Sequence, residues 1–250
     1  MLIELRIAAC AAMLVIAAII DIKKREIPDK IWVGFGSFGA VLAVLEFTVN
    51  PDGLGGTLAN NVFLYMVGIA IIAPIAYLIY KTGLFGGADS KALIAIAVLI
   101  PTYDFMLYKI HGFTVLTILT NALIISMSQV IINSVRNSIA VAKGVRIFEG
   151  IDEGPARKAL AFAMGYRSTS AVGYLFPMEG IDESGKRKFA FNPARYDEFV
   201  EDSESTKDAA PERGIWVTQA LPFIVYIAIG FAVTLTIGDI LGLVIRTALP

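Results

Sequence analysis

The sequence predicts an all-α polytopic membrane protein, with six transmembrane helices and a small cytosolic α+β insert between helices five and six. Three observations predict this class: the composition, the recurrence of apolar segments, and one long polar interval. The chain of 250 residues is 56% hydrophobic and 17% charged, with a mean hydropathy of +0.70. Soluble domains usually carry about 25% charged residues, so we expect lipid to surround much of this chain.

The apolar segments are long enough to cross a bilayer, which takes about 20 residues. Such segments form helices, because lipid cannot satisfy exposed backbone polar groups. We expect the first to be retained rather than cleaved as a signal peptide, since Glu4 and Arg6 make a poor basic region before it. The fourth is the weakest and should be short and kinked, because its apolar run stops at Pro101. The six candidate spans are 2–20, 31–49, 58–80, 90–108, 113–133 and 217–245.

The polar interval 143–215 carries 24 of the chain's 43 Asp, Glu, Lys and Arg residues. Within it, "AVGYLFPME" and "KRKFAF", separated by "GIDESG", predict two short strands around a turn. "EDSESTKDAAPERG" predicts a loose tether that returns to the membrane. We therefore predict a membrane domain over 1–142, a soluble domain over 143–215 and a final transmembrane helix within 216–250.

Basic residues predict the orientation, because they gather on the cytosolic side of membrane proteins. If the N-terminus lies outside, one face receives 18 of the 21 Lys and Arg residues, and the other receives only Arg6, Lys109 and Arg246. We expect a multi-pass protein of the cell membrane, with both termini outside and the soluble domain in the cytosol.

Charge and cysteine content exclude several classes of partner. A net charge of −1 gives no reason to expect nucleic acid. Cys10 is the single cysteine, so neither a disulfide within the chain nor a cysteine-based zinc site can form, and the single histidine, His111, has no neighbouring metal ligand. We expect membrane lipids as partners, and no cofactor, metal or nucleic acid.

Two acids at the membrane boundary are the candidate catalytic residues. Asp21 ends the first span in "AAIIDIKKREIPDK", and Asp89 lies in "KTGLFGGADSK" before the fourth. Because spans two and three return the chain to the face it left, both acids should lie at the cytosolic edge. If spans one and four pack together, the two carboxylates can share one proton. One could then activate water while the other polarises a peptide carbonyl, as in aspartic proteases.

Small residues precede the second acid. Gly86, Gly87 and Ala88 leave the backbone uncovered beside Asp89, which permits close approach of an extended peptide, so we predict that they bind substrate. Two structural interpretations stay open. Asp89 could N-cap the fourth helix, and Asp21 could be a solvated charge that balances the bases after it.

Two stretches, "DIKKREIPD" after the first span and "GGADSKALIAIAVLIP" entering the fourth, resemble the type IV prepilin peptidase and archaeal preflagellin peptidase family of membrane aspartyl proteases. By this resemblance, Asp21 and Asp89 are the catalytic pair. Ala88 departs from the family's G-x-G-D motif, which has a second glycine there. Many bacterial members carry a four-cysteine zinc region, so a single cysteine implies peptidase activity without methyl transfer.

The resemblance implies an aspartic endopeptidase that removes the short basic leader from prepilin-like or prearchaellin precursors at the cytosolic membrane face. Glu26 and Asp29 could attract the basic leader, and Lys91 could keep one carboxylate ionised; solvated loop charges and a snorkelling lysine are the competing interpretations.

Three other functions remain open. A protease of the presenilin and signal-peptide-peptidase kind also uses paired aspartates, but it cuts within the substrate's membrane helix. A cation-coupled transporter could use carboxylates as carriers, although the sequence has neither an inverted repeat nor paired mid-membrane acids. A structural membrane subunit is the third.

Overall fold

The computed structural model describes residues 2–49, 58–82, 86–101, 110, 112–169, 175–181, 185–191, 214–219 and 222–248. The far end of the predicted fourth span, most of the predicted tether, and His111 lie outside these ranges. The chain divides into two compact units, of which the first comprises Met1–Ser126 with Pro222–Pro250, and the second comprises Met127–Leu221.

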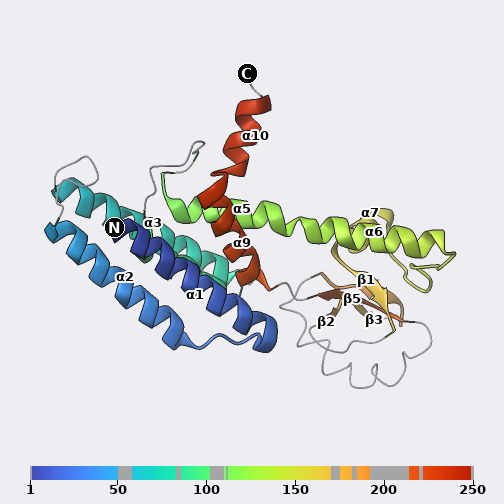
Figure 1. The fold of residues 1–250 in the computed structure, drawn as a ribbon. Helices are drawn as coiled ribbons and strands as arrows, with labels where there is room; N and C mark the ends of the chain where they lie inside the picture. The colour runs from blue at the N-terminus through green and yellow to red at the C-terminus, as the bar shows by residue number, and fades with distance from the viewer. Residues whose placement is uncertain are drawn as a thin grey trace. The chain divides into compact units, whose positions relative to one another are not determined.

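The first unit is a bundle of helices (Figure 1). The long apolar helix α1 ends where Arg25 adopts a left-handed conformation, with φ of 58°, and Pro28 directly precedes the next helix. Helix α4 ends two residues before Pro101, because proline disfavours a helical conformation at the residue before it. The helices are α1 (Leu2–Lys24), α2 (Asp29–Val49), α3 (Leu58–Lys81), α4 (Gly87–Leu99), α5 (Thr114–Ser126), α9 (Phe223–Thr236) and α10 (Ile240–Ala248).

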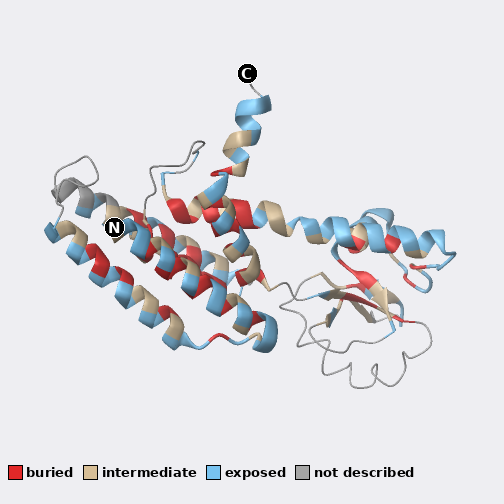
Figure 2. Ribbon diagram, viewed as in Figure 1, coloured by how far each residue is buried: buried red, intermediate tan, exposed pale blue. Residues whose placement is uncertain are grey.

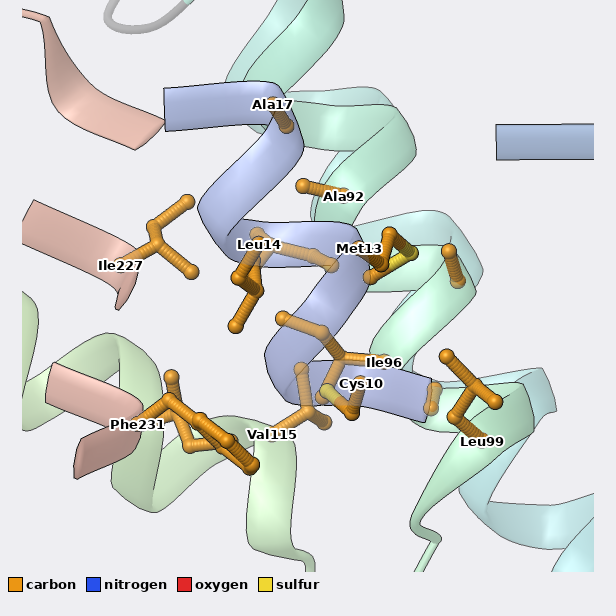
Figure 3. Close-up of a cluster of buried hydrophobic side chains, with 14 of the residues drawn as sticks. Cys10, Met13, Leu14, Ala17, Ala92, Ile96, Leu99, Val115, Ile227 and Phe231 are labelled. Atoms are coloured by element: carbon orange, nitrogen blue, oxygen red, sulfur yellow. The ribbon is translucent and has the colours of Figure 1, made fainter. Parts of the chain in front are cut away.

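Helix α4 lies at the centre of this unit, in contact with α1, α2, α3, α5 and α9. Figure 3 shows its Ala92, Ile96 and Leu99 packed among side chains of α1, α5 and α9. The outward faces of α1 and α2 are exposed (Figure 2), and their exposed residues include apolar ones such as Val15 and Val33. An apolar face turned away from the core is typical of a helix that contacts lipid.

Helices α5 and α9 approach each other very closely. A Cβ atom added to Gly230 of α9 would lie 2.7 Å from the carbonyl oxygen of Ile118 and 2.9 Å from the backbone nitrogen of Ala122, both in α5. Only glycine fits at this crossing, as is common where membrane helices pack through small residues.

Within the described residues, three helices are long and apolar enough to cross a membrane: Leu2–Lys24, Asp29–Val49 and Thr114–Ala142, the last combining α5 with α6 (Ser128–Ala142). The pair α9 and α10, bent by 55°, makes a fourth if it counts as one span. The chain is thus a mostly helical membrane protein, and the count of six spans stays a prediction.

The expected single helix over 217–245 is wrong. Its start lies in a strand, β5 (Ile215–Gln219), and its middle breaks between α9 and α10. Gly238 has a φ of +96° there, and its N–H donates a hydrogen bond to the carbonyl of Val233. This backbone conformation terminates α9. Asp239 is fully buried at this break and accepts hydrogen bonds from the N–H groups of Gly242 and Ile110, at 3.1 and 3.3 Å.

In its described residues, the second unit combines two helices with short strands. Its core surrounds Trp216, whose ring stacks on Phe148 at 5.2 Å and whose Nε1 donates to the carbonyl of Ile147. Strand β5 lies between two antiparallel neighbours in the order β1-β5-β2, and β3 pairs with β4. The elements besides α6 and β5 are α7 (Pro155–Met164), β1 (Tyr166–Ser168), β2 (Leu175–Pro177), β3 (Glu179–Ile181) and β4 (Arg187–Phe189).

The predicted hairpin is present in part. Strands β3 and β4 pair around the predicted turn, with Glu179 opposite Phe189. Residues 175–177, which the sequence assigns to the same hairpin, pair instead with β5. A small strand-containing region is therefore confirmed, with a pairing that the local pattern does not predict.

Candidate active site

Asp21 lies in the last turn of α1, and its side chain is buried, with 9% of the residue exposed. Its carboxylate accepts a hydrogen bond from the backbone N–H of Ile224, the second residue of α9. The first N–H groups of a helix have no partner within that helix and point outward. The start of α9 therefore provides a donor for Asp21, and the charge of Arg25 acts on the same carboxylate.

Asp89 is the third residue of α4 and is equally buried, with 8% exposed. Its Oδ2 accepts a hydrogen bond of 2.8 Å from the N–H of Gly86, the residue at the N-cap. Asp89 thus reaches back to the start of its own helix. The interpretation that Asp89 is itself the N-cap is wrong, because Gly86 occupies that position.

The two acids come to the same end of the bundle. Helices α1 and α4 run antiparallel in the shared core: Figure 3 shows Ala17 and Ala92 toward one end, and Cys10 and Leu99 toward the other. Asp21 lies one turn beyond Ala17, and Asp89 lies one turn before Ala92. The carboxylates are near enough for the charge of Asp21 to act on Asp89.

The small residues before Asp89 have different surroundings. A Cβ at Gly86 would meet Asp89 Oδ2 at 3.4 Å, whereas one at Gly87 would meet the ring of Tyr80, in α3, at the same distance. Gly86 is exposed, while Gly87 and Ala88 are half-buried. Gly86 therefore offers uncovered backbone beside the acid, and Gly87 also brings α4 close to α3.

Lys91 does not pair with Asp89. Its Nζ lies 2.6 Å from Oδ1 of Asp29, the first residue of α2, and both side chains are largely exposed. Two of the charged residues proposed as helpers thus bind each other, across the starts of α2 and α4. Glu26 is exposed in the preceding loop.

Sequence reasoning missed the Ile224 donor. It comes from the distant end of the chain, and only the tertiary fold brings it to Asp21. Among the described residues, no group of three or more His, Cys, Asp and Glu side chains could hold a metal ion. What the site offers is a pair of buried carboxylates, each with a backbone donor, at one end of a helical bundle.

Comparisons with known proteins match both parts of the chain. Residues 8–132 match the model of the type IV leader peptidase family, and residues 158–240 match that of the archaeal peptidase A24 C-terminus, type II. A preflagellin peptidase of Methanocaldococcus jannaschii is 26% identical over 236 residues, 90% of this chain and 91% of the relative. One of Methanococcus maripaludis is 27% identical over 90% and 92%. One of Methanococcus voltae is 36% identical over 98 residues, 38% of each chain.

Proposed function

The chain belongs to the type IV leader peptidase family, whose model covers half of it, and we propose that Asp21 and Asp89 are its catalytic pair. It is an aspartic-type endopeptidase of the membrane, and it removes leader peptides from precursors of the prepilin and preflagellin kind. The observation that carries the proposal is the presence of two buried carboxylates, from helices far apart in sequence, within electrostatic reach of each other.

The pair acts through one shared proton. The ionised carboxylate takes a proton from water as the water oxygen bonds to the scissile carbonyl carbon, and the protonated carboxyl donates to the carbonyl oxygen. The tetrahedral intermediate then collapses: the C–N bond breaks, the amine leaves with a proton from the pair, and the new carboxyl end is released. The N–H donors of Ile224 and Gly86 orient the two carboxylates and leave their remaining oxygens to react.

The site lies at the cytosolic edge of the membrane in this proposal. The length and number of the apolar segments support six spans, and the distribution of basic residues supports both termini outside and a cytosolic soluble domain over 143–215. Lys23 and Lys24 end α1 within one turn of Asp21, as expected where a helix enters water. A precursor would keep its basic leader in water and its apolar helix in lipid, so the junction to be cut lies level with the pair.

Small residues receive the substrate backbone. Gly86, Gly87 and Ala88 bind the extended junction, and the uncovered backbone at Gly86 carries most of that contact. Because the Asp29 carboxylate already pairs with Lys91, attraction of a basic leader falls mainly to the exposed Glu26.

The test is cleavage of a purified preflagellin precursor by the full chain in lipid nanodiscs. We expect Asp21→Asn and Asp89→Asn each to lower kcat by about 10²- to 10⁴-fold, the usual contribution of general acid–base catalysis. Asparagine keeps an oxygen that can accept the hydrogen bonds of Ile224 and Gly86, so folding should persist. Asp29→Asn, at the same edge of the bundle, is the matched control and should keep most of the activity.

The position of the cut separates this function from its nearest rival. Mass spectrometry of the products should place the cut before the precursor's apolar stretch. Cuts within that stretch would favour an intramembrane protease of the presenilin kind, and parental rates in both aspartate variants would rule out the catalytic pair.

A further inference from the structure

A second buried charged cluster lies at the opposite end of α4. Arg6 of α1 is 2% exposed, and its Nη1 donates to the carbonyl of Leu99, the last residue of α4, at 3.0 Å. Its Nη2 lies 2.9 Å from Oε2 of Glu46 in α2, an ion pair without an aligned hydrogen bond. The hydroxyl of Tyr65 in α3 donates to the carbonyl of Val98 and lies beside the guanidinium.

The length of α4 explains why donors are needed there. Its 13 residues span about 20 Å at 1.5 Å per residue, which is less than the roughly 30 Å of a hydrocarbon core. The last carbonyls of a helix have no partner within the helix, and lipid offers none. Arg6 and Tyr65 satisfy two of these carbonyls, at Leu99 and Val98.

The charge of Arg6 is balanced within the cluster. A charged side chain inside a membrane is costly and is usually paired. Glu46 supplies the counter-charge from a different helix, and its side chain is 23% exposed. Through this cluster, α1, α2 and α3 all hold the same end of α4.

Polar groups therefore lie at both ends of the interface between α1 and α4. At one end are Asp21 and Asp89, and at the other is the bond from Arg6 to Leu99. Between them the contact is apolar, with small side chains such as Ala17 and Ala92 beside larger ones such as Leu14 (Figure 3). Apolar burial is non-directional, whereas a hydrogen bond requires a defined geometry. The two acids repel each other when both are ionised, so they cannot set this register themselves.

We propose that Arg6, with Glu46 as its counter-ion, is a positioning residue that fixes α4 lengthwise against α1 and so holds Asp89 level with Asp21. The role rests on the catalytic pair proposed above. A misplacement of about 1 Å at a catalytic group can cost about 10²-fold in rate. The cluster thus acts on catalysis from the far end of the helix.

The test compares geometry with turnover in the full chain. Cys10 is the only cysteine, so a Cys10→Ala background accepts two spin labels, at Ile22→Cys in α1 and Ile94→Cys in α4, both exposed positions. In the Arg6→Leu/Glu46→Leu double variant, we expect the label-to-label distance distribution to shift or broaden. In the unlabelled double variant, kcat for preflagellin cleavage should fall about 10- to 100-fold, with KM unchanged.

Two further variants serve as rescue and control. Arg6→Lys keeps a positive donor at the carbonyl of Leu99, so it should restore the parental distances and bring kcat to within about threefold of the parent. Thr48→Ala alters an exposed residue near Glu46 on α2 and should change neither measurement. If the double variant does not accumulate, Glu46→Gln, which removes the counter-charge at nearly constant shape, takes its place.

The outcomes separate the two proposals. Parental distances in the double variant would overturn the positioning role, and so would a parental kcat despite altered distances. A lower melting temperature with unchanged kcat per folded molecule would mean that the cluster only stabilises the fold. The proposal that Asp21 and Asp89 are the catalytic pair is tested separately. It would fail if Asp21→Asn and Asp89→Asn cleaved the precursor at the parental rate.

Discussion

The two ends of helix α4 carry opposite kinds of buried charge pair. Asp89, at the start, lies within electrostatic reach of a second carboxylate, whereas Leu99, at the end, accepts a hydrogen bond from an arginine that is paired with a glutamate. Two like charges in a poorly hydrated place favour a shared proton. Two opposite charges favour a fixed, fully ionised contact. In the function proposed above, the start of α4 is therefore its reactive end, and the end at Leu99 is its inert end.

This difference teaches that burial of charge does not by itself indicate catalysis. Arg6 is more deeply buried than Asp21 or Asp89, yet its guanidinium only pairs with Glu46 and donates a hydrogen bond to a backbone carbonyl. At the other end two like charges lie close together, and in the proposed mechanism they share a proton that can move. The sign of the partner, more than the depth of burial, distinguishes the two ends.

The largest expected effect is on stability at the inert end. Glu46→Leu leaves Arg6 buried without a counter-charge, which typically costs about 3–5 kcal/mol. Asp89→Asn removes one of two like charges and should leave the free energy of unfolding unchanged or slightly higher. Thermal unfolding in nanodiscs compares the two variants. Equal losses of stability would show that the buried charges at the two ends of α4 contribute equally to the fold.

The second effect concerns the reactive end. Gly86 has a φ of −68°, which proline can adopt, so Gly86→Pro removes the N–H that holds Asp89 with little backbone strain. A hydrogen bond to a charged group contributes about 1.5–3 kcal/mol, so we expect kcat to fall roughly 10- to 100-fold. Gly86→Ala keeps the N–H and should lose less activity. Equal kcat values for the two variants would mean that this donor does not orient the acid.

A smaller effect is expected where α2 packs on the inert end. A Cβ at Gly39 would lie 3.0–3.2 Å from atoms of Leu99, including its Cα, whereas one at Gly36 would have no atom within 4 Å. Overpacking costs about 1–3 kcal/mol, so Gly39→Ala should lower the melting temperature and Gly36→Ala should not. Equal melting temperatures would indicate that this contact can relax.

The smallest effect is expected for the exposed ion pair at the reactive end. Lys91 and Asp29 are in contact but largely exposed, and such pairs contribute about 0–1 kcal/mol. Asp29→Asn should therefore change the free energy of unfolding by less than about 1 kcal/mol, and added salt should reduce that change further. A loss of stability as large as that of Glu46→Leu would mean that the exposed pair stabilises the fold as much as the buried pair does.

The placement of Asp21 and Asp89 at one edge could be predicted from the sequence, because it depends only on counting membrane crossings, whereas their approach also requires α1 and α4 to pack together. Each apolar segment changes sides once, so two acids separated by an even number of further spans return to the same edge. That argument needs no contact between particular atoms. The structure brings both acids to one end of the first unit, and the placement of that end at the cytosolic edge stays a prediction.

The contacts that orient these acids could not be predicted in the same way. The Ile224 donor and the bond from Arg6 to Leu99 depend on which helices pack side by side, and hydropathy does not encode this. Strand β5 could not be predicted for a different reason. Its sequence, "IWVTQ", begins with apolar residues that are equally compatible with the start of a membrane span. Pro222, between strand and helix, was the one local signal of the boundary.

The crossing of α5 and α9 leaves no space for a single methyl group at Gly230. Because the two backbones are in such close contact, a displacement of α5 at this crossing would push on α9. The N–H of Ile224, near the start of α9, donates a hydrogen bond to Asp21. A substitution in α5 at this crossing can therefore change the orientation of the Asp21 carboxylate through α9.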